Sequence, residues 1–124
     1  MTQVAITHPQ WQPICKRSDL VADSGVCALV GDSSLGNNRS IALFFLPDCE
    51  PELYALDNWD PFSKAGVIAR GLVAEVDGQL TVASPLYKQH FRLSDGVCLE
   101  DENVKLNSYQ VAFDGDTVCI AVDL

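Results

Sequence analysis

Residues 53–96 read LYALDNWDPFSKAGVIARGLVAEVDGQLTVASPLYKQHFRLSDG, and their alternation of short apolar segments and turn residues is the clearest indication of the fold. Three short apolar segments within it, Leu53–Leu56, Leu72–Val76 and Leu80–Ala83, have the length and composition of β-strands. The second and third segments flank Asp77-Gly78, a dipeptide that accepts the positive φ angles of a tight hairpin turn. The stretch therefore predicts antiparallel strands joined by short turns.

The flanking sequence repeats the same alternation of short apolar runs and turn-forming residues. The further strands that we expect are Gly25–Val30, Arg39–Leu46, Gln89–Leu93, Tyr109–Phe113 and Thr117–Val122. Polar residues 32–38 and 114–116 would connect two hairpins, and Asp57–Pro61 is expected to be a loop. Helix is suggested only at Arg17–Ala22 and Pro61–Ala65. Roughly eight to ten short strands with such turns predict an all-β fold, an antiparallel β-sandwich or small barrel with little helix.

Length, charge and hydropathy limit what the chain can be. Its 124 residues fit one domain spanning 1–124, in which residues 1–10 are expected to form a loosely ordered N-terminal extension. A net charge of −9 repels phosphate backbones and anionic lipids. The longest apolar run, Ile41–Leu46, is too short to cross a membrane, and the N-terminus lacks a signal-peptide pattern. We therefore expect a cytoplasmic protein that binds neither nucleic acid nor membrane.

The cysteine and histidine pattern does not favour metal or nucleophilic chemistry. Five cysteines occur without C-x-x-C or C-x-H spacing, so most are expected to be buried thiols that pack as small apolar residues. The two histidines, His8 and His90, lie far apart in the sequence, and no thiol has an identifiable base beside it. We predict no catalytic residue and no metal site.

From Leu53 onward the order of elements resembles the Rieske iron–sulfur fold, with a strand, a loop, a hairpin and a second loop. Rieske proteins carry Cys-x-His on the first loop and Cys-x-x-His on the second, and these residues hold a [2Fe–2S] cluster. The matching positions in this chain are Asn58, Asp60, Ser84 and Tyr87, which offer oxygen and amide groups where the cluster requires sulfur and imidazole. The resemblance implies a Rieske-like domain without a cluster.

The chain is also similar, over nearly its whole length, to the small subunit of bacterial NAD(P)H-dependent nitrite reductase. The matching segments are Trp11–Cys15, Gly25–Leu29, Asn58–Phe62, Arg70–Leu72, Ser84–Gly96 and Cys98–Asp101. This resemblance implies an assimilatory or detoxifying complex that reduces nitrite to ammonium. The large subunit would carry FAD, an iron–sulfur cluster and sirohaem, and this chain, without a cofactor, would be its non-catalytic partner, supporting assembly or electron flow.

Two other functions fit the same sequence. One is a Rieske-type, ferredoxin-like electron carrier with an atypically ligated [2Fe–2S] cluster, and the missing ligands argue against it. The other is an unrelated β-sandwich binding module, since fold alone does not fix function.

If the two loops meet at one tip, their aromatic and basic residues form a candidate docking patch for the large subunit. The patch consists of Trp59, Pro61, Phe62, Pro85, Tyr87, Lys88 and His90. Trp59 and Phe62 could instead fold inward as core. Asp57, Asn58 and Asp60 could bind a hard cation, although loop capping explains them more simply. Arg70 and Lys88 could meet an acidic patch on the large subunit or remain solvated or paired within the chain.

Overall fold

The structure, a computed structural model, describes residues 10–31 and 39–122. The predicted loop 32–38, His8 and residues 1–9 of the predicted extension lie outside the described residues. The strands are β1 Gln10–Lys16, β2 Ser24–Val30, β3 Arg39–Phe45, β4 Leu53–Asp57, β5 Trp59–Asp60, β6 Ala65–Gly66, β7 Leu72–Val76, β8 Gln79–Ala83, β9 His90–Arg92, β10 Ser108–Tyr109, β11 Val111–Asp114 and β12 Thr117–Val122. Helix among the described residues is limited to two 3-10 turns, Arg17–Asp19 and Ile68–Arg70.

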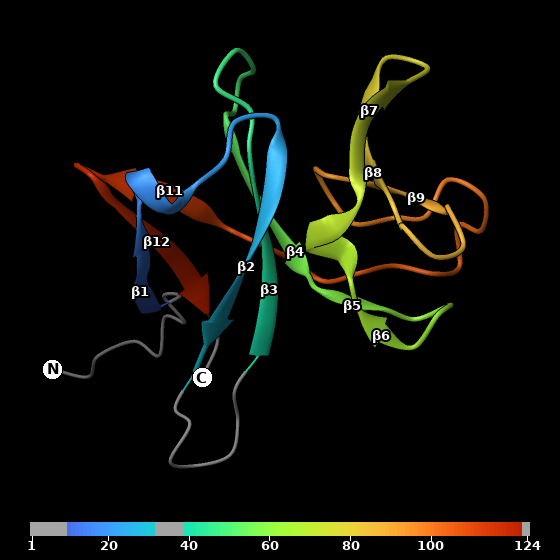
Figure 1. The fold of residues 1–124 in the computed structure, drawn as a ribbon, viewed down its shortest axis with the longest axis horizontal. Coiled ribbons are helices and arrows are strands. Elements are labelled where there is room, and N and C mark those ends of the chain that lie inside the picture. The colour runs from blue at the N-terminus through green and yellow to red at the C-terminus, as the bar shows by residue number, and fades with distance from the viewer. Residues whose placement is uncertain (1–9, 32–38, 123–124) are drawn as a thin grey trace, which may run out of the picture.

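The strands form four small sheets, as Figure 1 shows. Their strand orders are β10-β4-β3-β2, β1-β12-β11, β7-β8-β9 and β5-β6, and every pairing is antiparallel. The first two sheets lie on one side of the molecule, and the β7–β9 sheet with β5 and β6 lies on the other (Figure 1). The predicted all-β, antiparallel fold with little helix is confirmed.

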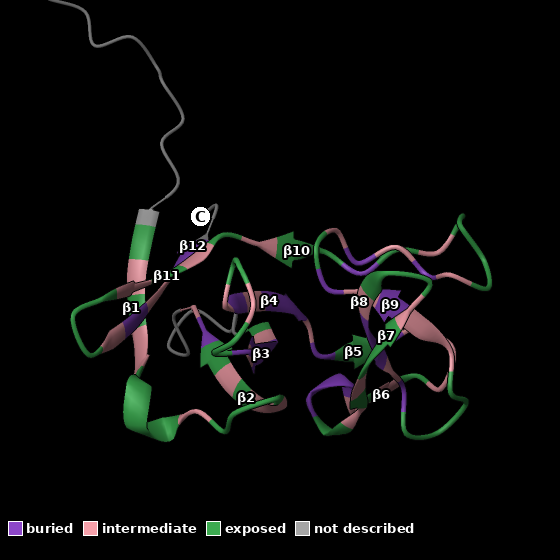
Figure 2. Cartoon of the chain, turned by 90° about the horizontal axis from the view of Figure 1, so that it is seen from above, coloured by how far each residue is buried: buried purple, intermediate pink, exposed green. Residues whose placement is uncertain are grey.

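β3 lies at the centre of the molecule, and side chains on both of its faces are buried. Ile41 and Leu43 point into a hydrophobic cluster that also contains Val118 and Ile120 of β12. This cluster packs the first two sheets against each other. Ala42 and Phe44 point the other way, into a cluster with residues of the β7–β9 sheet such as Val82 and Phe91. Figure 2 shows the buried segments of β3 and β4 between the two sides. β4 therefore leads out of the core directly into the loop that begins at Asn58.

Of the two helix predictions, that at Pro61–Ala65 was wrong and that at Arg17–Ala22 was confirmed over half of its length. Residues 61–64 are the turn between β5 and β6, in which the Lys64 N–H donates to the Asp60 carbonyl over 2.7 Å, and Ala65 begins β6. Helix at Arg17–Ala22 is limited to the 3-10 turn at Arg17–Asp19. The 3-10 turn at Ile68–Arg70 was not predicted.

Several strand boundaries also differ from the prediction. The segment Asp57–Pro61, expected to be a loop, contains the two residues of β5, and β1 was not predicted. The expected strand Tyr109–Phe113 is interrupted at Gln110, so that β10 pairs with β4 and β11 pairs with β12. The hairpins β2–β3 and β7–β8 were predicted correctly.

Candidate functional site

The two loops that resemble the cluster loops of Rieske proteins meet at one end of the molecule. We call residues 58–71 loop 1 and residues 84–90 loop 2. Of the four positions that match cluster ligands, Asn58, Asp60 and Ser84 are buried, whereas Tyr87 is 62% exposed. Three of the four therefore face the interior of the site.

A buried hydrogen bond joins the loops directly. The Ser84 hydroxyl donates to Asp60 Oδ2 over 2.5 Å, and we call this contact the clasp. Asp60 also accepts from the Ser63 hydroxyl over 2.8 Å and from the Phe62 N–H over 2.9 Å. The Asp60 carboxylate thus organises its own loop and holds loop 2 against it.

Asn58 ties loop 1 to the core. Its side-chain nitrogen donates to Ser40 Oγ over 3.1 Å and to the Gly66 carbonyl over 3.2 Å, while Oδ1 accepts from the Ala69 N–H over 2.8 Å. Both ends of the amide are used, as expected for a buried polar side chain. The loop-capping explanation of Asn58 and Asp60 is therefore correct, and Asp60 also makes a cross-loop bond that was not anticipated.

The electrostatics favour a charged Asp60. Burial by itself would raise the pKa of this carboxyl, but the hydrogen bonds from Ser84, from Ser63 and from the backbone of Phe62 and Ser63 lower its pKa below the ordinary value. A charge-assisted hydrogen bond is shorter and stronger than a neutral one, which agrees with the 2.5 Å separation in the clasp. Asp60 is thus a stabilised anion and lacks the raised pKa of a buried general acid.

These residues do not fit a [2Fe–2S] cluster. Rieske clusters need two thiolates and two imidazoles, and the matching positions here carry none. The amide of Asn58 is engaged with the chain itself, and the direct contact between Asp60 and Ser84 closes the loops on each other. Within residues 10–31 and 39–122, no three His, Cys, Asp or Glu side chains gather where they could hold a metal ion.

The residues of the predicted docking patch divide into those that are exposed to solvent and those that are partly buried. Pro85, Tyr87 and Lys88 are exposed, and Trp59 is 54% exposed, so the alternative that Trp59 belongs to the core is wrong. The core alternative holds for Phe62, which is half-buried and lies 6.2 Å from the ring of Phe91.

The remaining residues of the predicted patch are partly buried. Pro61 is half-buried, and His90 is half-buried with its Nδ1 2.7 Å from a carboxylate oxygen of Glu100. Sequence reasoning missed Lys64 and Leu86, which are exposed on the same loops. Each directly follows a turn-forming residue, Ser63 or Pro85, and this was the available signal.

The cysteines differ from the prediction. Cys98 is buried, three others are half-buried, and Cys27 is exposed beside Ser40, with 3.1 Å between Sγ and Oγ. The expectation that most thiols are buried was wrong: Cys15 and Cys27 lie on the edge strands β1 and β2, and Cys49 lies in the turn after β3.

The fold and the altered loops define the chain as a Rieske-like protein, and comparison with known families agrees. Residues 10–121 match the family described as Rieske-like [2Fe-2S] domain. The chain is 46% identical over 101 residues to the nitrite reductase (NADH) small subunit of Escherichia coli K12, with 82% of this chain and 87% of that protein covered. The chain therefore belongs to the family of nitrite reductase small subunits, as its sequence predicted.

Two further relatives bear on the function. The solution structure of the nitrite reductase [NAD(P)H] small subunit from Erwinia carotovora superposes with a TM-score of 0.72 at 42% identity, covering 91% of this chain and 82% of that one. A segment of the nitrite reductase [NAD(P)H] large subunit of Klebsiella oxytoca is 41% identical to this chain over 92 residues, which is 74% of this chain and 9% of that protein. Small-subunit sequence thus also occurs within a large subunit.

Across the part of the chain that the structure describes, no helix is long and apolar enough to span a membrane.

Proposed function

We propose that this chain is the small subunit of a cytoplasmic NAD(P)H-dependent nitrite reductase and acts as a non-catalytic partner of the large subunit. The observation that carries the proposal is the clasp, because Asp60 and Ser84 stand where a Rieske protein holds its cluster and join the loops instead. Membership in the small-subunit family supports the choice of enzyme. The related segment inside a Klebsiella oxytoca large subunit supports the choice of partner.

The redox cofactors of such a complex would belong to the large subunit. Reduction of nitrite to ammonium requires hydride and one-electron steps that flavin, iron–sulfur and sirohaem groups supply and that amino-acid side chains cannot. The contribution of this chain is a preformed surface. The clasp fixes loops 1 and 2, and the exposed residues of the predicted docking patch would contact the large subunit from this end.

Reconstitution with the large subunit of the same organism tests the proposal. We expect the tagged chain to co-purify with the large subunit and to raise either the rate of nitrite-dependent NAD(P)H oxidation or the lifetime of that activity. A rate measured at once after mixing reports on turnover, and a rate after incubation reports on stability of the complex. A chain that neither binds the large subunit nor changes either rate would contradict the proposal.

A further inference from the structure

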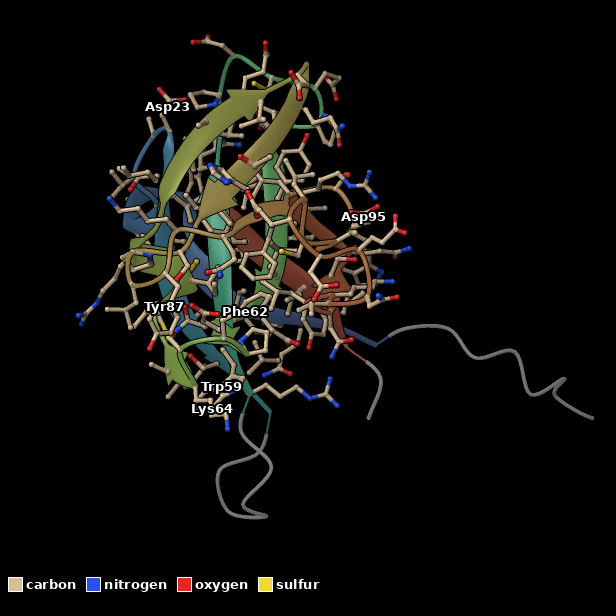
Figure 3. The ribbon with its side chains drawn as sticks, turned by 90° about the vertical axis from the view of Figure 1, so that its right-hand side faces the viewer. Asp23, Trp59, Phe62, Lys64, Tyr87 and Asp95 are labelled. Carbon is tan, nitrogen blue, oxygen red and sulfur yellow. The ribbon has the colours of Figure 1, made fainter. Side chains whose placement is uncertain are left out.

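Large apolar side chains that reach solvent gather on loops 1 and 2. Trp59 and Leu86 are each 54% exposed and Tyr87 is 62% exposed, so these loops hold three of the seven large hydrophobic residues exposed among the described residues. Figure 3 shows Trp59 and Tyr87 at the same end of the molecule. Exposed apolar clusters mark interaction sites, and Trp and Tyr are frequent anchors of protein interfaces.

The same loops carry positive charge on an otherwise acidic chain. Lys64, Arg70 and Lys88 are exposed, and the one acidic residue in residues 58–71 and 84–90, Asp60, is buried under its hydrogen-bond donors. Glu100 also lies against loop 2, where its carboxylate accepts from the His90 N–H over 2.7 Å, and its negative charge counts against these cations. Asp23 and Asp95 lie away from this end (Figure 3). The three exposed cations outnumber the carboxylates of Asp60 and Glu100, so this end of the molecule is locally cationic although the net charge is −9.

The two lysines are held by equivalent turns that begin at the clasp. The Lys64 N–H donates to the Asp60 carbonyl over 2.7 Å, and the Lys88 N–H donates to the Ser84 carbonyl over 3.0 Å. Each lysine has a positive φ, +57° for Lys64 and +62° for Lys88, which a side chain with Cβ adopts at a cost and glycine adopts freely. Lysine at these two positions is less favourable for folding than glycine would be, so we explain both lysines by a role in binding.

We propose that Trp59, Lys64, Arg70, Leu86, Tyr87 and Lys88 form a cationic tip that binds an acidic surface of the nitrite reductase large subunit. This inference rests on the proposed function and adds the chemistry of the contact. Trp59 and Tyr87 supply the apolar anchors, and the three cations orient the encounter and select an acidic partner surface. The clasp keeps both lysines in position before binding, which reduces the ordering cost of association.

Calorimetric titration of the full-length chain into the purified, cofactor-loaded large subunit tests the inference at about 50 mM and about 500 mM salt. We expect wild-type affinity to fall about tenfold or more at the higher salt, because exposed charges are screened. Trp59→Ala should lower affinity about tenfold or more at both salt concentrations. The double variant Lys64→Gln/Lys88→Gln should lower affinity about tenfold at low salt and lose most of the salt dependence.

Two controls separate binding from folding. Lys16→Gln removes an exposed charge at the end of β1, on the opposite side of the molecule in Figure 1, and should change affinity less than about twofold. Lys64→Gly/Lys88→Gly relieves the positive φ while removing both charges, so its melting temperature should be equal to or higher than that of the wild type, with weakened binding.

The outcomes distinguish this inference from the proposed function. A wild-type chain that does not bind the large subunit overturns the proposed function and the inference with it. A wild-type chain that binds, with tip variants of unchanged affinity or a Lys16→Gln variant that is equally impaired, overturns the cationic tip and leaves the proposed function intact. If Lys64→Gly/Lys88→Gly melts at a lower temperature than the wild type, the two lysines stabilise the fold, and the inference of a cationic tip is overturned as well.

Discussion

Replacing Ser84 by alanine removes one hydroxyl from the clasp and almost no volume. Ser84 is 1% exposed and Asp60 is 0% exposed, so water cannot replace the lost donor across the 2.5 Å contact. A hydrogen bond to a charged group stabilises a protein by about 1.5–3 kcal/mol, and a buried pair belongs in the upper half of that range. We therefore expect Ser84→Ala to lower the free energy of unfolding by about 2–3 kcal/mol.

Ser63→Ala is the matched control because the Ser63 hydroxyl donates to the same Asp60 oxygen over 2.8 Å from within the same turn. Ser63 is half-buried, so water can take its place, and the expected loss is about 1 kcal/mol or less. Urea unfolding followed by tryptophan fluorescence measures both losses. Equal losses, or a smaller loss for Ser84→Ala, would show that the cross-loop bond does not stabilise the protein more than the bond within loop 1.

Two other predictions concern the Asp60 carboxylate and Gly96. Because the pKa of Asp60 is lowered on folding, its contribution to stability is complete above its ordinary value of 3.8 and is lost as the pH falls through the folded pKa. Urea titrations should therefore show the stability gap between wild type and Asp60→Asn narrowing from about pH 6 to about pH 2, and a constant gap would contradict this. Gly96→Ala should cost at least about 3 kcal/mol, because backbone strain at positive φ adds to overpacking where a new Cβ would meet the Leu106 carbonyl oxygen at 2.1 Å. Gly78→Ala, at a similar φ with open space around it, should lower the free energy of unfolding by about 1 kcal/mol. Similar losses at the two positions would contradict the prediction, because they would show that the backbone around Gly96 shifts to accept a Cβ with little loss of stability.

Much of the sheet structure could be predicted because local turn chemistry fixed it. Asp77-Gly78 predicted a hairpin, and both residues have positive φ, +51° and +80°, in the turn between β7 and β8. β1 was missed because Pro13 interrupts its pattern. In the structure Pro13 lies on an edge strand beside a register shift, where a missing N–H is tolerated.

The segment after Asp60 was mispredicted because a side chain decides its conformation. A propensity argument favoured a helical turn at Pro61–Ala65, but the Asp60 carboxylate accepts the Phe62 N–H and closes an Asx-type turn instead. β5 and β6 contain two residues each and depend on that turn. Strands this short carry no periodic signal of their own.

The candidate site could be located from the sequence but its internal contacts could not. The positions of Asn58, Asp60, Ser84 and Tyr87 followed from the order of the elements. The clasp joins residues 24 positions apart, and only the packed fold brings Asp60 and Ser84 together. Lys64 was missed because its positive φ and its exposure follow from the turn rather than from any motif.

The iron content and visible absorption spectrum of the anaerobically purified full chain show whether this chain holds a cluster. If the clasp has replaced the cluster, the folded protein is colourless and contains no stoichiometric iron. Stoichiometric iron with charge-transfer bands between sulfur and iron would contradict the account, because a cluster would then be held by residues other than those of the Rieske pattern.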